Sequence, residues 1–234
     1  MKHAKFFASA ALLLASWAVA KSACAQPPYQ PKSFPVAQIR FEQNATDGDV
    51  EVVFEVSGRG EGLTKLAVEA PDGRRVVDFA SDESGAAVSG IRQFVFESPE
   101  PKDVAGLKAA FPEGVYNFEG ETESGLKLRG KAALSHKLPA TTSFVIPKAN
   151  APDVPASDLT ISWAPVSQVT AYIVELEQED LNTSITARLP ASAKSFAVPN
   201  GFLRPGAEYQ LGIGTVGQDG NVSYVETHFS TADK

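Results

Sequence analysis

Cysteine is almost absent from this sequence, since Cys24 is the single one among 234 residues. A disulfide framework within one chain is therefore excluded, and so is a cysteine-rich zinc site. Histidine is also scarce, with three in the whole chain. His136 and His228 stand in separate segments, and no His-Glu-x-x-His pattern brings two histidines onto one helix face. We therefore expect neither a metal nor a cofactor.

Motifs for catalysis are missing as well. No serine lies in a Gly-x-Ser-x-Gly turn, the nucleophile motif of one large hydrolase class. The triplet Asp47-Gly48-Asp49 lacks the further oxygen ligands of a calcium loop, so a solvated turn explains it better. The 28 acidic residues allow so many carboxylate pairs that none is singled out for glycoside hydrolysis. We predict that the protein is not an enzyme; the alternative is an enzyme whose residues converge only in three dimensions, within the N-terminal domain.

Positive charge is in short supply, because 21 lysines and arginines face 28 acidic residues and give a formal net charge of −7. An acidic surface opposes binding to nucleic acid and to anionic membranes. We therefore exclude nucleic acid as a partner. Long apolar runs are missing too: after the first 25 residues no stretch approaches the roughly 20 apolar residues that a spanning helix needs.

One apolar segment does occur, at the start of the chain. Lysines precede the run FFASAALLLASWAVA, and SACAQ then supplies an Ala-x-Ala pattern. This is the arrangement of a secretory signal peptide over residues 1–25, cleaved between Ala25 and Gln26. A lipid anchor on Cys24 is the alternative, although a lysine stands where such signals usually carry an aliphatic residue. We expect an exported bacterial protein, periplasmic or secreted.

Proline-rich segments divide the rest of the chain. Residues 26–35 (QPPYQPKSFP) have four prolines in ten and no periodicity, which predicts an extended leader without a packed role. Residues 147–157 again combine proline with small residues and predict a semi-rigid linker. The predicted domains are therefore 36–146 and 158–232.

The first of these regions has the pattern of strands. Apolar and polar residues alternate over 50–57, which is typical of a half-buried strand. Residues 63–80 predict a hairpin around a Pro-Asp-Gly turn, 91–98 a further strand, and 114–134 a second pair. Residues 103–111 instead place apolar side chains at helical spacing. These segments predict an antiparallel, immunoglobulin-like sandwich with one short helix.

The second region is a succession of short strands. Leu159, Ile161 and Trp163 alternate with polar residues, which places all three in a core. Further on, Tyr209 follows a Pro-Gly pair in the stretch LRPGAEYQLGI. In Greek-key sandwiches a tyrosine near the start of a strand hydrogen-bonds the backbone a few residues upstream. We therefore predict a second antiparallel sandwich with a tyrosine at one corner.

With these residues the stretch from about Ser157 to Thr231 resembles a fibronectin type III domain. The residues that carry the resemblance are the core tryptophan, the strand tyrosine and the corner motif, namely Trp163, Tyr172, Leu203, Pro205 and Tyr209. The resemblance implies a module that binds or spaces and does not catalyse. An Arg-Gly-Asp tripeptide, which some members use in cell adhesion, is absent. In the first region, FPEGVYNFEG and GLKLRGKAALSHKLPA resemble a family of exported bacterial proteins with such a module at the C-terminal side, which implies a layout and no chemistry.

The function hypothesis that follows is a non-catalytic exported protein, built as two tandem antiparallel β-sandwiches, that binds or spaces a partner. The expected partner is another envelope or extracellular protein. Loops on a rigid scaffold commonly carry function, so residues 164–170 and 218–222 are the predicted contact surface. Carbohydrate is the alternative ligand, and Tyr116 and Tyr224 are the tyrosines left over as surface rings for it.

Overall fold

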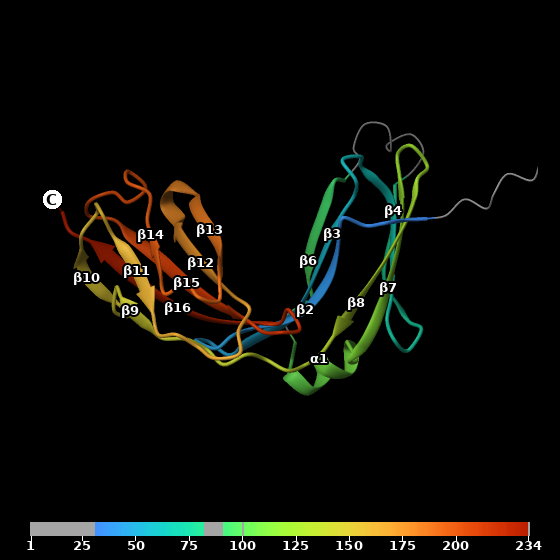
Figure 1. The fold of residues 1–234 in the computed structure, drawn as a ribbon, viewed down its shortest axis with the longest axis horizontal. Helices are drawn as coiled ribbons and strands as arrows, with labels where there is room; N and C mark the ends of the chain where they lie inside the picture. Colours follow the sequence, from blue (N-terminus) through green and yellow to red (C-terminus); the bar gives the residue numbers. More distant parts are fainter. Residues whose placement is uncertain (1–30, 82–90, 100, 234) are drawn as a thin grey trace, which may run out of the picture. The chain divides into compact units, whose positions relative to one another are not determined.

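The computed structural model describes residues 31–81, 91–99 and 101–233, and its elements are almost all strands (Figure 1). The fold is all-β, as predicted. Cys24 and the cleavage site at Ala25 and Gln26 lie outside the described residues. The elements are β1 (Lys32–Ser33), β2 (Val36–Asn44), β3 (Asp49–Ser57), β4 (Leu63–Glu69), β5 (Arg75–Ala80), β6 (Gln93–Glu97), α1 (Val104–Ala110), β7 (Gly114–Thr122), β8 (Lys127–Leu134), β9 (Phe144–Ile146), β10 (Ala151–Val154), β11 (Thr160–Trp163), β12 (Ala171–Gln178), η1 (Glu179–Leu181), β13 (Thr183–Pro190), β14 (Ser195–Ala197), β15 (Glu208–Val216) and β16 (Val222–Thr231).

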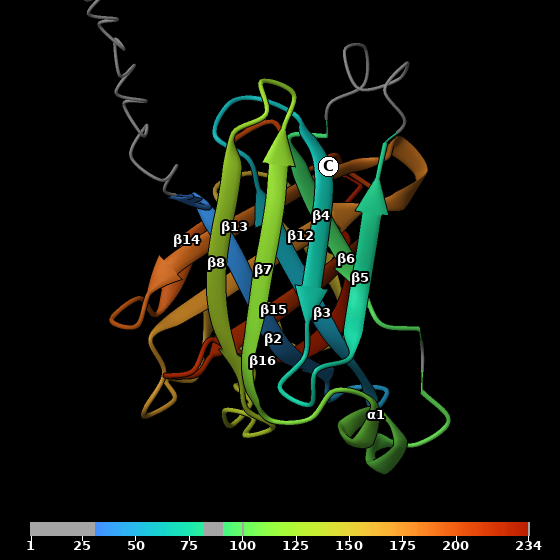
Figure 2. The same ribbon diagram turned by 90° about the vertical axis from the view of Figure 1, so that its right-hand side faces the viewer.

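The strands form three sheets. Five of them follow the order β1-β8-β7-β4-β5, and Figure 2 shows β8, β7, β4 and β5 side by side in that order. A second sheet runs β13-β12-β15-β16-β2-β3-β6, with β10 attached to β16. The third is small and runs β14-β11-β9. Apart from the parallel pairs of β1 with β8, β10 with β16 and β2 with β16, the strand pairs are antiparallel.

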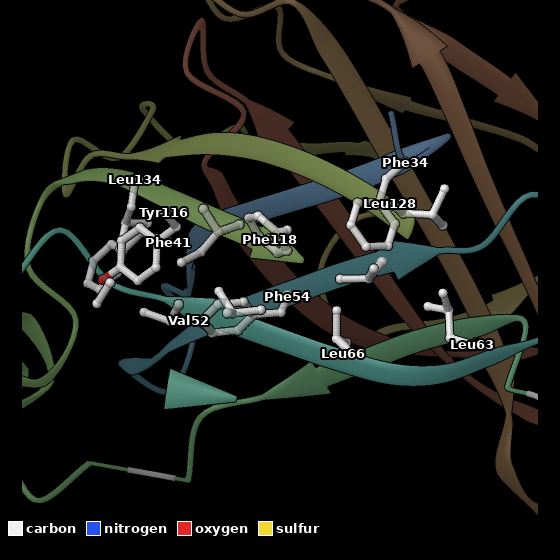
Figure 3. Close-up of a cluster of buried hydrophobic side chains, with 14 of the residues drawn as sticks. Phe34, Phe41, Val52, Phe54, Leu63, Leu66, Tyr116, Phe118, Leu128 and Leu134 are labelled. Atoms are coloured by element: carbon white, nitrogen blue, oxygen red, sulfur yellow. The ribbon is translucent and has the colours of Figure 1, made fainter. Parts of the chain in front are cut away.

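The first hydrophobic core lies between the five-stranded sheet and the strands β2, β3 and β6 (Figure 3). Val52, Phe54 and Val56 of β3 are buried in it, so the strand predicted over 50–57 is confirmed. Phe118 of β7 reaches the same core from the opposite sheet. Burial of one such side chain contributes about 1.5–3 kcal/mol, and this cluster therefore stabilises the packing of the two sheets.

The predicted hairpins and helix are also present. In the turn between β4 and β5, Gly73 has a φ of +82°, a conformation that favours glycine. Helix α1 begins after Asp103, whose carboxylate accepts a hydrogen bond of 2.6 Å from the amide of Gly106. This cap satisfies an amide that the first helical turn leaves without a partner. Leu107 then anchors the helix in the first core.

The predicted leader is wrong where it meets the fold. Residues 32–33 form β1, which pairs in parallel with β8. Phe34 is buried in the first core. The proline count of this segment was a poor guide because its single phenylalanine supplies enough apolar surface to hold the chain against β7 and β8.

The second hydrophobic core contains the residues of the tyrosine corner. The hydroxyl of Tyr209 accepts a hydrogen bond of 2.8 Å from the amide of Arg204, which is the contact expected upstream. Tyr172 accepts one of 2.7 Å from the amide of Val166 in the same way. Trp163 is buried, and its ring centre lies 5.2 Å from that of Tyr172. Leu203 is buried beside them, whereas Pro205 is exposed.

The segment predicted as a linker is not a free spacer. Residues 151–154 within it form β10, which pairs with β16, and Val154 is buried in the second core. The strand β9, just before it, pairs with β11. The extended conformation that proline favours was thus used for strand pairing. The domain limits at 36–146 and 158–232 stay a prediction.

The second sheet is continuous across the two cores. Near its start β16 pairs with β2, with Val222 opposite Glu42 and Tyr224 opposite Asn44. Towards its end the same edge of β16 pairs with β10 instead. One strand therefore joins the strands around the first core to those around the second by backbone hydrogen bonds.

Candidate functional site

The junction between β2 and β16 is fixed by one buried amide. Asn221 is 1% exposed, and its Oδ1 accepts a hydrogen bond of 2.7 Å from the backbone amide of Phe41. Its Nδ2 donates to the carbonyls of Ser135 and Lys137, both at 2.9 Å. A buried polar group that is fully hydrogen-bonded specifies one arrangement, because any other would leave it unpaired.

The chain between β8 and β9 is held along the same junction. Thr215 of β15 donates its hydroxyl to the carbonyl of Ala140 at 2.8 Å. Ser223 of β16 donates to the carbonyl of Pro139, also at 2.8 Å. Two consecutive carbonyls of the connecting segment are therefore bonded to strands around the second core.

The opposite face of the junction carries Tyr224. A Cβ atom added to Gly214 would lie 2.8 Å from the Cε1 atom of this tyrosine, so the ring rests directly on the glycine. Gly214 and Tyr224 are paired neighbours on β15 and β16. The absence of a side chain on β15 is what allows the ring to lie down on the sheet, where it is 8% exposed.

Tyr224 is hydrogen-bonded to a carboxylate on the same face. Its hydroxyl donates to Glu175 on β12 at 3.2 Å. Burial raises the pKa of Glu175, and the negative charges of Glu42 and Glu226 raise it further. Burial also raises the pKa of Tyr224, with Glu175 as the next cause, so this phenol stays protonated as a donor.

A cluster of charged side chains on β2 and β3 lies on the same face as Tyr224 and Glu175. Arg40 donates from Nε to Glu42 at 2.7 Å in a largely buried ion pair. Burial raises the pKa of Glu42 in spite of Arg40. Glu51, directly opposite Glu42 on β3, has its pKa raised to about 7 by burial and by Glu97, Glu42 and Asp49. These acidic groups therefore outnumber the cation that they surround.

A groove of about 620 Å³ opens on this face. Ile173, Val222 and Tyr224 provide apolar surface, and charged and polar residues from both sides of the junction surround them. The lining residues are Gln38, Ile39, Arg40, Glu55, Ala132, Ala133, Ile173, Glu175, Thr186, Arg188, Gln218, Asp219, Gly220, Val222 and Tyr224. Grooves that combine an apolar floor with a few convergent polar groups are the usual form of a ligand site.

The predicted contact loops only partly agree with this site. Gln218 and Asp219 do line the groove, but Asn221 of the same loop is buried in the junction. The other loop, 164–170, contributes Ser167 and Gln168 to a hollow of about 510 Å³ beside the connecting segment, and Gln218 and Asp219 line that hollow as well. Residues of both loops therefore lie around one hollow, and the contact surface at 164–170 and 218–222 stays a prediction.

Two further expectations about side chains need correction. Tyr116 is fully buried and Tyr224 nearly so, hence neither is a surface ring for a sugar. Tyr116 packs in the first core with its hydroxyl donating to the carbonyl of Pro112 at 3.0 Å, because the alternation of β7 turns it inward. The sequence reasoning missed Arg40 and Glu175 altogether. The pattern LGIGTV, with two glycines in one strand, was the available signal that a neighbouring ring lies there.

The histidines lie apart from this groove and from each other. Nε2 of His136 is 2.8 Å from the carbonyl oxygen of Phe111, while Nδ1 of His228 is 3.7 Å from Oε1 of Glu208. In the ranges that the structure describes, no group of three or more histidine, cysteine or acidic residues is placed to hold a metal ion. No helix in those ranges has the length and apolar character needed to cross a membrane.

No protein-family model matches the chain, and a comparison with curated proteins finds no match. Solved structures do match. The similar structures are fibronectin type III modules. A segment of two such domains from chicken tenascin is 16% identical, with 83% of this chain and 99% of that chain covered and a TM-score of 0.32.

Two further structures are similar. The fibronectin(III)-like modules of Clostridium thermocellum CbhA are 11% identical, with 85% of this chain and 91% of that chain covered and a TM-score of 0.33. The FN1–FN3 domains of chicken CNTN1 are 12% identical, with 86% and 65% covered and a TM-score of 0.33.

Proposed function

We propose that this chain is a non-catalytic, exported binding protein that takes a segment of another envelope or extracellular protein into the groove at the β2–β16 junction. The observation that carries the proposal is the groove itself, which is built on one continuous sheet and lined from both sandwiches. A free linker would let the two walls of such a groove move apart. Here the hydrogen bonds of Asn221, Thr215 and Ser223 hold them together, so the site is preformed.

The residues around the groove suit binding better than catalysis. Arg40 is neutralised by Glu42, and the hydroxyl of Tyr224 is engaged by Glu175. No serine, threonine or cysteine nucleophile in the described part of the groove is hydrogen-bonded to a histidine, as an acyl-transfer site would need. The other non-catalytic function is that of a spacer, which holds other components apart without binding a ligand. A spacer would need no groove.

Site-specific photo-crosslinking distinguishes binding from spacing. A benzophenone amino acid replaces Thr186, an exposed residue on the β13 wall of the groove, and in a control chain it replaces Val115, which is 47% exposed on the other sheet. Both chains are irradiated in envelope extract of the host. We expect discrete protein adducts from position 186 alone. An excess of unmodified chain should suppress these adducts by competition. An excess of the Ala133→Trp chain, in which the new side chain narrows the groove, should not suppress them. Equal labelling from both positions, or none from position 186, would contradict binding at the groove.

The exported location is tested by the mature N-terminus. Mass spectrometry of the chain from its host should find Gln26 as the first residue. An acylated Cys24 would make the protein lipid-anchored, and an intact Met1 would contradict export.

A further inference from the structure

The outer face of the second sheet concentrates the charge of the protein. In the seven strands from β13 to β6, every acidic residue and every arginine points to the face away from the two cores, as the pairing and alternation require. The acidic residues are Glu42, Asp49, Glu51, Glu55, Glu97, Glu175, Glu177, Glu208 and Glu226, and the arginines are Arg40 and Arg188. This face therefore has a formal charge of −7, which equals the charge of the whole chain. The remaining charges sum to zero over the full sequence and to −3 over residues 26–234, which lack the three lysines of the predicted signal peptide.

The five-stranded sheet shows what an ordinary charged face looks like. On its strands, basic and acidic side chains are intermixed and form ion pairs, such as Lys65 with Glu121 and Arg129 with Glu119. On the outer face of the second sheet, within the described residues, Arg40 pairs with Glu42 and His228 lies 3.7 Å from Glu208, and the other acidic residues there outnumber the cations. A negative potential of this sort attracts cations and repels anions.

The acidic face also contains the groove with its apolar floor. An acidic patch on a flat surface would have neither. Glu55, Glu175 and Asp219 line the groove around Ile173 and Tyr224. Long basic side chains carry apolar stems below a charged head, so they suit a site with apolar surface below and carboxylates at the rim. Burial and the negative charges of Glu42 and Glu226 raise the pKa of Glu175, and a cation beside it in the groove would relieve that repulsion.

The spacing of the acidic groups favours an extended chain over a small cation. Glu175 on β12 and Glu55 on β3 are separated by β15, β16 and β2. Four strand spacings of about 4.8 Å put them roughly 19 Å apart across the strands, and the pairing registers offset them further along the strands, so only an extended peptide of about six residues or more covers the distance. A compact cation reaches one of these groups, whereas a peptide with several basic residues reaches both.

We infer that the groove takes a lysine- or arginine-rich extended segment of a partner protein. This inference rests on the proposed function and specifies the chemistry of the segment. The two arginines of the face, Arg40 and Arg188, also line the groove, so the basic residues of the segment must lie beside Glu55, Glu175 and Asp219 and apart from these two arginines.

The test uses a fluorescent hexapeptide of alternating lysine and leucine as the probe. We expect saturable binding to the purified chain with one site, and a loss of at least about tenfold in affinity between about 0.05 M and about 0.5 M salt, because screening shortens the reach of surface charges. A hexapeptide of alternating glutamate and leucine should not bind. Spermine should compete only weakly; binding as tight as that of the peptide would overturn the assignment in favour of a small polycation.

Charge variants locate the site on the molecule. The double variant Glu55→Gln/Glu175→Gln should weaken lysine-peptide binding about tenfold, while Glu69→Gln/Glu119→Gln on the five-stranded sheet, with the same loss of charge, should not. Because Glu175 is hydrogen-bonded to Tyr224, its replacement could weaken binding through a folding defect. Two variants of Thr186 therefore serve as an independent test. At the exposed Thr186, Thr186→Glu should strengthen binding and Thr186→Lys weaken it, whereas the same changes at Val115 should do neither.

The outcomes separate the two proposals. If position 186 forms protein adducts in envelope extract but the charge variants all bind the lysine peptide with the same affinity, the inference is wrong and the groove still binds a partner. If position 186 forms no adducts, the proposed function is wrong whatever the peptide does. Equal effects at Thr186 and Val115 would also overturn the inference, since binding would then follow net charge alone.

Discussion

Oδ1 of Asn221 lies 2.7 Å from the backbone nitrogen of Phe41, although 180 positions separate the two residues in the sequence. The same amide donates to Ser135 and Lys137 in the connecting segment. One side chain thus ties together β2, the connecting segment and the loop before β16. None of these three partners can move alone without leaving a buried polar group unpaired.

Replacing this amide should therefore be costly. Asn221→Ala leaves the amide of Phe41 and two carbonyls without partners, and each unpaired buried group costs about 1–3 kcal/mol, so we expect a loss of at least about 3 kcal/mol in the free energy of unfolding. Urea denaturation measures it. Asn200→Ala is the control, because Asn200 is exposed where it bonds Asp158 and should change stability by less than about 0.5 kcal/mol. Equal losses in the two variants would contradict a structural role for Asn221.

Two glycines of β15 should differ sharply when replaced by alanine. At Gly214 the new Cβ would lie 2.8 Å from the ring of Tyr224, whereas at Gly212 the nearest atom is Cβ of Glu175 at 3.6 Å. We expect Gly214→Ala to lose about 1–3 kcal/mol through overpacking and Gly212→Ala to be neutral or slightly stabilising. Thermal denaturation of both variants tests this. If Tyr224→Leu fails to rescue Gly214→Ala, contact with the ring is not the cause.

Stability should decline as the pH rises through neutrality. The pKa of Glu51 is about 7 in the folded chain, above its ordinary value of 4.5, so folding takes up a proton in this window. The stabilisation from that proton is complete below about pH 4.5 and is lost as the pH rises past 7. Urea midpoints at several pH values between these limits should fall for the native chain and fall less for Glu51→Gln. The control Glu69→Gln should keep the native slope.

The hydroxyl of the corner tyrosine should make its own contribution to the free energy of unfolding, separate from that of the buried ring. Tyr209→Phe keeps the buried ring but leaves the amide of Arg204 without its 2.8 Å acceptor. We expect a loss of about 1–2 kcal/mol in the free energy of unfolding, with no change in the groove. The lysine peptide should therefore bind Tyr209→Phe with native affinity. A loss of peptide binding without a loss of stability would mean that this corner communicates with the groove.

Local patterns predicted the local elements well. The alternation of Val50, Val52 and Phe54 was sufficient to predict β3, and the helical spacing of Val104 and Leu107 was sufficient for α1. Trp163 was assigned to a core from two aliphatic neighbours at alternate positions, and it is buried there. These features depend on residues a few positions apart, and over that range the sequence shows the periodicity of apolar residues that a strand or a helix requires.

The groove could not be predicted in the same way. Its walls meet because β2 pairs with β16, and a contact across 180 positions leaves no periodic pattern in either strand. Tyr224 was expected at the surface because the other tyrosines, apart from Tyr116, had been assigned to the core or to the leader. The expectation failed because Gly214, on the next strand, leaves the ring room to lie flat. Only the partner strand decides whether an outward ring is exposed.

The pairing of β2 with β16 also fixes the order in which strand edges are covered while the chain emerges from the ribosome, N-terminal end first. The strands around the first core emerge early, but the free edge of β2 has to wait for β16, the last strand described, before it is covered. An uncovered strand edge is a template for pairing with other chains. Until β16 emerges, the edge of β2 is therefore exposed to mispairing, and a chaperone that shields strand edges would act on this protein at that stage.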